Sequence, residues 1–233
     1  MCIRDRSSPR GAIARESQSE SMLRMREASV FMSGKPNLYR ICILTALMAL
    51  SAVGSAWSAD GRIVPQSVSD SYFNECGLYT GAGYGRVAEG PYVPIFLILH
   101  LGVDAKRWLP SIREHRGTLT VFIEPQFNPS GTPKQNAEIG LGIGLKYSYP
   151  VNETISMYAL GSVGPHYMTL DTADQAQGFL FADTIGAGMS VFISRGSAIN
   201  VEYRFRHLSN AGIKSPNLGV NSNIGLIGFT LFY

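Results

Sequence analysis

The chain has 233 residues and only 16% charged side chains, which is long enough for one domain and too weakly charged for a disordered protein. Its formal charge of +3 comes from the first 58 residues, with 8 Lys and Arg against 4 Asp and Glu, since the rest holds 12 against 13. This balance argues against a nucleic-acid partner, because binding a phosphate backbone needs a clustered basic surface.

Residues 32–59 are expected to be a secretory signal peptide. Lys35 and Arg40 form its charged start, residues 41–53 are uncharged and apolar, and small residues at Ser58 or Ala59 provide a cleavage site. The apolar stretch is shorter than the ~20 residues of a spanning helix, which favours export over a membrane anchor. By this division, residues 1–31 are an upstream or spurious extension and residues 60–233 are the exported barrel domain.

Strand-like segments with alternating apolar and polar residues recur after residue 60. In residues 137–149, large apolar side chains alternate with small or charged ones, and two tyrosines end the apolar face. A membrane barrel presents such a face to lipid and places aromatic residues at the membrane interfaces. A soluble β-sandwich or lipocalin-like barrel, which would turn the same face inward, is the alternative.

Eight strands are predicted, and an even number is typical of closed outer-membrane barrels. Their expected ranges are residues 75–86, 92–103, 118–128, 136–149, 154–169, 178–193, 197–209 and 222–233. Short turns alternate with longer loops, apart from a longer link at residues 109–116, so both ends of the barrel are expected on the periplasmic side. The predicted fold is therefore all-β, an eight-stranded antiparallel transmembrane β-barrel in the outer membrane of a Gram-negative cell.

The last strand supports this prediction, because its apolar residues alternate up to the aromatic Tyr233, as in the C-terminal signal of outer-membrane barrels. An eight-stranded barrel is filled by side chains and is too narrow for a diffusion pore. Its function is therefore expected on the loops, the rim or the outer wall.

Charged residues on the opposite faces of the strands are expected to form a structural network inside the barrel. They are Glu124, Glu138, Lys146, Glu202, Arg204 and Arg206. The histidines at 100, 115 and 166 lack metal-ligand spacing, so no metal site is predicted.

The seventh predicted strand, residues 197–209, carries a candidate catalytic pair. Its apolar face ends in His207 and Ser209, two polar residues on a wall where polar groups are costly without a purpose. A histidine can act as the general base that activates a hydroxyl nucleophile. Residues two apart on a strand are spaced by ~6.6 Å at the backbone, so the two side chains would have to lean together.

Residues 206–219 read Arg-His-Leu-Ser-Asn-Ala-Gly-Ile-Lys-Ser-Pro-Asn-Leu-Gly. This run resembles the signature of the outer-membrane lipid A 3-O-deacylase family, which is acyloxyacyl hydrolase-like, and residues 183–188 add to the likeness. The resemblance implies a carboxylic ester hydrolase that removes the 3-O-linked acyl chain of lipid A in lipopolysaccharide. It implies no cofactor, and some members of the family form homodimers.

By this resemblance, His207 is the general base and Ser209 is the nucleophile. The region of Asn210 is a candidate oxyanion stabiliser. Gly212 and Asn217, from the same run, are candidate supporting residues.

The position that matches the glutamate of active family members is Asn221, and no Asp or Glu occurs from residue 203 to residue 233. An asparagine can orient a histidine but supplies no charge, and an Asp→Asn change at this role costs ~10⁴ in kcat in a serine protease. The alternative function is therefore a non-catalytic, structural outer-membrane barrel that has lost its catalytic acid.

Asp183 is a candidate replacement for the missing carboxylate. A three-residue turn at residues 194–196 would pair Ile193 with Ser197. Antiparallel counting from that pair sets Asp183 opposite His207, with their Cβ atoms ~5 Å apart on the same face of the sheet.

Overall fold

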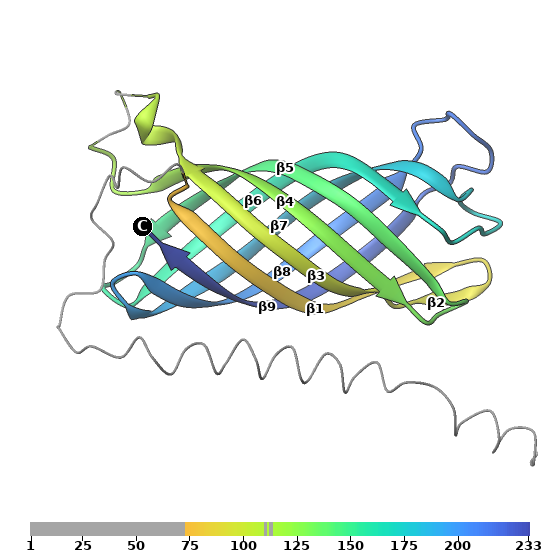
Figure 1. The fold of residues 1–233 in the computed structure, drawn as a ribbon, viewed down its shortest axis with the longest axis horizontal. Coiled ribbons are helices and arrows are strands. Elements are labelled where there is room, and N and C mark those ends of the chain that lie inside the picture. Colours follow the sequence, from red (N-terminus) through yellow and green to blue (C-terminus); the bar gives the residue numbers. More distant parts are fainter. Residues whose placement is uncertain (1–72, 110, 112–113) are drawn as a thin grey trace, which may run out of the picture. The chain divides into compact units, whose positions relative to one another are not determined.

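The computed structural model describes residues 73–109, 111 and 114–233, which contain one antiparallel sheet closed into a barrel (Figure 1). In chain order its elements are β1 (Glu75–Val87), β2 (Gly90–Tyr92), β3 (Ile95–Asp104), the 3₁₀ turn η2 (Ala105–Arg107), β4 (Thr118–Ser130), β5 (Asn136–Pro150), β6 (Ile155–Met168), β7 (Gly178–Ser194), β8 (Ser197–Ser209) and β9 (Val220–Phe232). β1 pairs with both β2 and β3, each strand from β3 to β8 pairs with the next along the chain, and β1 pairs with β9 to close the sheet. The expected signal peptide and upstream extension lie outside the described residues.

The predicted second strand is broken into two pieces. β2 pairs with the last residues of β1, and β3 pairs with the rest of β1, so the two pieces together fill one position around the barrel. The break falls at Val93 and Pro94, where proline has no N–H to give to a ladder. The eight-stranded barrel is confirmed, while the single strand predicted at residues 92–103 is wrong.

The two ends of the sheet lie side by side at one end of the barrel. Glu75 of β1 pairs with Phe232 of β9, and the N–H of Tyr233 donates to the carbonyl oxygen of Asn74 at 3.1 Å. The short connections at residues 151–154 and 195–196 lie at this same end (Figure 1). We refer to it as the periplasmic end and to the end with the longer loops as the extracellular end, following the rule for outer-membrane barrels. In the part of the chain that the structure describes, no helix is long and apolar enough to cross a membrane.

The turn between β7 and β8 differs from the prediction. Ser194 pairs with Ser197 across a two-residue turn, and the register shifts between Phe192 and Ser194. The predicted Ile193–Ser197 pair is therefore wrong. The shift takes up one residue, so the rest of the ladder keeps the predicted register, and Asp183 does lie opposite His207.

The outer wall of the barrel is apolar. Large side chains that alternate along the strands are exposed there, including Leu78 at 60%, Ile139 at 62% and Ile185 at 66% exposure. This exposure confirms that the apolar faces of the strands point outward. The alternative of a soluble barrel, which would bury these faces, is wrong.

The predicted charge network lies inside the barrel. Arg204 donates to both carboxylate oxygens of Glu124 at 2.5 and 2.8 Å, and Arg206 donates to those of Glu138 at 2.5 and 3.0 Å. Arg204 also binds Glu202. Two residues outside the predicted network also take part: Glu75 pairs with Lys146, and the ring of His100 contacts Glu124. Buried charges are tolerated when they are paired in this way.

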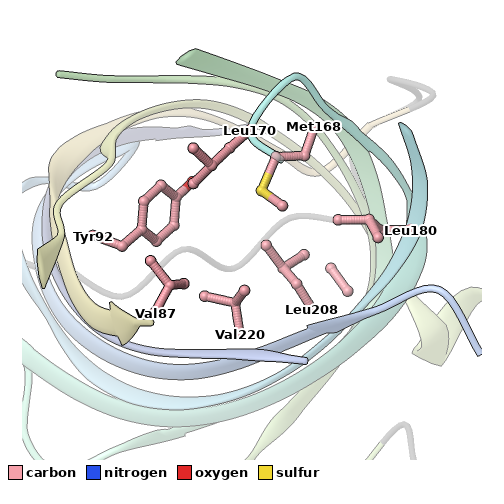
Figure 2. Close-up of a cluster of buried hydrophobic side chains, with 8 residues drawn as sticks. Val87, Tyr92, Met168, Leu170, Leu180, Leu208 and Val220 are labelled. Atoms are coloured by element: carbon pink, nitrogen blue, oxygen red, sulfur yellow. The ribbon is translucent and has the colours of Figure 1, made fainter. Parts of the chain in front are cut away.

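The extracellular end of the interior is filled by an apolar cluster, which we name the extracellular plug (Figure 2). Its members are Val87, Tyr92, Met168, Leu170, Leu180, Ala182, Leu208 and Val220, which come from β1, β2, β6, β7, β8, β9 and the loop after β6. Each is at most 6% exposed. The plug closes the interior at this end, so a ligand is expected to bind on the loops or the outer wall.

Candidate active site

Three of the predicted site residues form one row on the outer wall at the extracellular end. In the ladder, Asp183 of β7 pairs with His207 of β8, and His207 pairs with Asn221 of β9. Asp183 and Asn221 are exposed, and His207 is half-buried. Ser209 lies two residues beyond His207 on the same face of β8, where it pairs with Phe181. The closed sheet thus brings together the residues predicted for catalysis.

The row is held from inside by the extracellular plug. Ala182 precedes Asp183, Leu208 separates His207 from Ser209, and Val220 precedes Asn221. All three of these neighbours are buried members of the plug. Because alternate residues of a strand point to opposite faces, burying one set fixes the backbone from which the other set projects.

His207 and Asn221 share a hydrogen bond, with 2.7 Å between Nδ1 of the ring and Oδ1 of the amide. An amide oxygen can only accept, so Nδ1 donates this hydrogen bond. Nε2 is thereby the ring nitrogen left for proton transfer as a general base. Asn221 therefore orients His207 through Nδ1 and leaves Nε2 unengaged by the amide.

The ring of His207 leans toward the end of the strand at which Ser209 lies. A Cβ atom built on Gly219 would be 2.4 Å from Cε1 of the ring and 3.0 Å from Nε2. Leu208 pairs with Val220, so the next step of the ladder sets Gly219 opposite Ser209. The Nε2 edge thus reaches the level of Ser209, although among the described residues no hydrogen bond joins the two side chains.

Gly219 is the last residue of the run at 206–219, and the sequence alone predicts no role for it. Its φ of +82° lies in the left-handed region, which favours glycine, and it leaves the space that the imidazole occupies. The signal in the sequence was a glycine just before a strand, but its contact with His207 depends on how the loop folds back.

Asp183 contributes a carboxylate beside His207. Directly opposite residues have Cβ atoms about 5 Å apart. No hydrogen bond between Asp183 and His207 is formed in the described part of the chain, where the ring bonds to Asn221 instead. Asp183 can therefore act on the ring through its charge rather than by orienting it.

The loop between β8 and β9 is folded around Asn210, which is 2% exposed. The backbone N–H of Asn210 donates to Oδ1 of Asn217 at 2.7 Å, and its side-chain amide donates to the carbonyl oxygen of Lys214 at 2.7 Å. Its own Oδ1 accepts from the N–H of Gly212 at 3.0 Å. Asn210, Gly212 and Asn217 thus hold the loop that leads from Ser209 to Asn221. The N–H groups of Asn210 and the backbone N–H of Gly212 are used in these hydrogen bonds.

The wall below the row is apolar with one polar pair. Phe205 and Ile185, which pair with each other, are exposed on the side nearer the membrane centre. Tyr203 donates its hydroxyl to Oδ1 of Asn223 at 2.5 Å. The site therefore joins a polar rim to a lipid-facing wall, which suits an amphipathic substrate. No group of three or more His, Cys, Asp or Glu side chains that could hold a metal ion occurs among the described residues.

Comparison with known proteins shows what the chain is similar to. The family model described as lipid A 3-O-deacylase (PagL) matches residues 99–230. The crystal structure of the outer membrane enzyme PagL is 21% identical, covering 66% of this chain and 97% of that chain with a TM-score of 0.48. No curated protein matches the chain.

Two further crystal structures are similar to the chain. Neisserial surface protein A is 10% identical, covering 68% of this chain and 96% of that chain with a TM-score of 0.51. The attachment invasion locus protein Ail of Yersinia pestis is 14% identical, covering 69% of this chain and 99% of that chain with a TM-score of 0.44. The likeness to neisserial surface protein A supports the closed β-barrel fold of this chain.

Proposed function

The chain belongs to the lipid A 3-O-deacylase family, and from this premise we propose that it is an outer-membrane esterase that removes the 3-O-linked acyl chain of lipid A. The observation that carries the proposal is the 2.7 Å contact between His207 and Asn221 on the outer wall. It orients the imidazole through Nδ1 and leaves Nε2 beside Gly219, at the level of Ser209.

In this reaction Nε2 of His207 takes the proton of the Ser209 hydroxyl as Oγ attacks the ester carbonyl carbon. The sugar oxygen then leaves and receives that proton, while the acyl chain stays on Ser209 as an ester. Water, deprotonated in turn by His207, attacks this acyl-enzyme, and the fatty acid is released as the bond to Oγ breaks and His207 returns the proton to Ser209. Every proton is carried by His207, so the reaction needs no cofactor.

The location of the row supports this substrate. Acyl chains of lipid A lie in the outer leaflet, beside the apolar wall that carries Phe205 and Ile185. A substrate reaches His207 and Ser209 by lateral diffusion along the wall and needs no route through the plugged interior. The ester linkage lies near the headgroup, which matches the extracellular end of β8.

The second candidate function is a structural barrel without catalysis. It is favoured by one observation, the amide of Asn221 where a charged acid would stabilise the imidazolium that forms in the reaction. The two candidates differ in a single measurable property, which is the turnover of lipid A.

The test is mass spectrometry of lipid A from a Gram-negative host that expresses the wild-type chain or Ser209→Ala. The proposal expects loss of one acyl chain with the wild type and intact lipid A with Ser209→Ala. Ser215→Ala is the matched control, since Ser215 is an exposed serine of the same loop, and it is expected to behave as wild type. Intact lipid A in all three strains, with folded barrels in the outer membrane, would establish the structural alternative.

A further inference from the structure

Arg86 has an unusual position on the barrel wall. Of the charged residues in the described strands, only Arg86 of β1 and Asp183 of β7 are exposed. The other charges of the strands face the interior or lie at a strand end. A charge on the outer wall of a membrane barrel is costly unless it lies at the headgroup level and serves a purpose.

The closure of the barrel sets Arg86 beside the candidate active site. The last pair between β1 and β9 joins Gly85 to Ser222, so one further step sets Arg86 opposite Asn221. The approach is close, because a Cβ atom on Gly85 would lie 2.4 Å from the carbonyl oxygen of Asn221. Arg86, Asn221, His207 and Asp183 therefore follow one another across four adjacent strands.

The spacing suits recognition of a headgroup. Adjacent strands are about 4.8 Å apart, so the backbones of Arg86 and His207 are separated by roughly 10 Å. This is about the size of one sugar with its substituent, and a long arginine side chain can shorten the gap. Arg86 is on one side of the His207–Asn221 pair and the carboxylate of Asp183 is on the other side.

The guanidinium of Arg86 forms no ion pair or hydrogen bond with any described side chain. The three acids of the adjoining loops accept from backbone N–H groups: Glu89 from Ala173 at 2.8 Å, Asp174 from Ala88 at 2.6 Å and Asp171 from Gln177 at 3.1 Å. The donors of Arg86 are thus available to an external anion.

We propose that Arg86 binds a phosphate group of the lipid A headgroup and thereby positions the 3-linked ester at Ser209. A guanidinium donates two parallel hydrogen bonds to a phosphate, which fixes orientation as well as location. Asp183 repels the same phosphate, so the substrate docks in one direction along the row. This inference rests on the proposed deacylase function and names the group by which the substrate is recognised.

The kinetic test uses purified wild type, Arg86→Ala and Arg86→Lys in detergent micelles, with phosphorylated lipid A and with the same lipid A after its phosphates are removed. A lost charge-assisted contact of this kind corresponds to a rise of about 10- to 100-fold in KM. We expect this rise for Arg86→Ala on phosphorylated lipid A, with kcat nearly unchanged and a smaller rise for Arg86→Lys. On dephosphorylated lipid A the three proteins are expected to be equal. An equal loss on both substrates would overturn the proposal.

A binding test separates this inference from the proposed function. Native mass spectrometry measures how much phosphorylated lipid A is bound to Ser209→Ala and to the double variant Ser209→Ala/Arg86→Ala, neither of which depends on turnover. The proposal expects weaker binding of phosphorylated lipid A by the double variant. It also expects that added dephosphorylated lipid A does not displace the bound phosphorylated lipid A. Competition by inorganic phosphate or phosphatidylglycerol at equal concentration would overturn the lipid A assignment in favour of a general phosphate site. Equal binding by both variants would overturn the proposal even if the wild type proves inactive.

Lys134→Ala is the matched control in both tests. Lys134 is an exposed cation on another extracellular loop, between β4 and β5. Its removal takes away the same charge at a distance from the row, so we expect neither KM nor binding to change. A loss equal to that of Arg86→Ala would assign the effect to the overall surface charge and overturn a specific role for Arg86.

Discussion

Asn221 and His207 face each other across the β8–β9 pair, and the amide oxygen of Asn221 accepts a hydrogen bond from Nδ1 of His207 at 2.7 Å. The amide thus orients the histidine, as a catalytic acid would. It cannot stabilise the imidazolium that would form when Ser209 is deprotonated, because it has no charge.

Asn221→Glu is expected to raise kcat for lipid A deacylation, between about 10- and 10⁴-fold, because a carboxylate would add that charge where the orientation already exists. The measurement is single-substrate kinetics on purified lipid A. Asn223→Glu is the control, since Asn223 lies two residues further along the same exposed face of β9. A gain with Asn223→Glu as large as with Asn221→Glu would mean that any carboxylate on the wall suffices.

Asp183→Asn is expected to lower kcat by about 10- to 100-fold. The carboxylate of Asp183 is exposed and lies directly opposite His207, so its negative charge would stabilise the imidazolium that forms in the reaction. The same change made in the Asn221→Glu background is expected to cost much less, since the glutamate then supplies the charge. A double-mutant cycle on kcat measures this coupling. Additive effects of the two substitutions would contradict a shared role at the ring.

Gly219→Ala is expected to lower kcat at least 10-fold, because the added methyl group would lie 2.4 Å from Cε1 of His207 and displace the ring. Gly178→Ala is the control. Gly178 also has a positive φ, of +116°, but a Cβ atom there meets nothing within 4 Å. Both variants carry the backbone strain, so a similar loss of activity in both would assign the effect to strain rather than to the ring.

Glu124→Gln is expected to destabilise the barrel by about 3 kcal/mol, because it removes the buried carboxylate that Arg204 and His100 share and leaves Arg204 with Glu202 and His100 with Glu75. Urea unfolding of the barrel in lipid vesicles measures the free energy. Glu153→Gln, at an exposed position in the turn between β5 and β6, is expected to leave it unchanged. Equal stability of the two variants would show that the interior network is neutral.

Most of the fold could be predicted from the sequence because its strongest signal is local. Alternation of apolar and polar residues specified seven of the eight strand positions nearly to their ends, and the outward direction of residues such as Ile139 followed from it. The break at Val93 and Pro94 was missed because the residues on both sides of it are strand-like. The turn at Ser194 was missed because a register shift cannot be read from residue types.

The candidate site divides in the same way. His207 and Ser209 were predicted from a contiguous run, Asn221 from the matching position just after that run, and Asp183 by counting through one turn. Arg86 could not be found in this way, because it lies more than 100 residues before His207 and comes near it only through the closing pair of β1 and β9. The contact of Gly219 with the His207 ring likewise depends on how the loop around Asn210 folds back.

The strands around the extracellular plug divide two tasks between alternate residues. Ala182, Leu208 and Val220 support the barrel from within, while Asp183, His207 and Asn221 carry no part of that packing. The outward-facing residues can therefore be substituted one at a time while the packing inside the barrel stays intact. Such a barrel is suited to acquiring new activities on its outer wall. An acid, an amide or a different nucleophile can be exchanged at the membrane boundary without a change in the core.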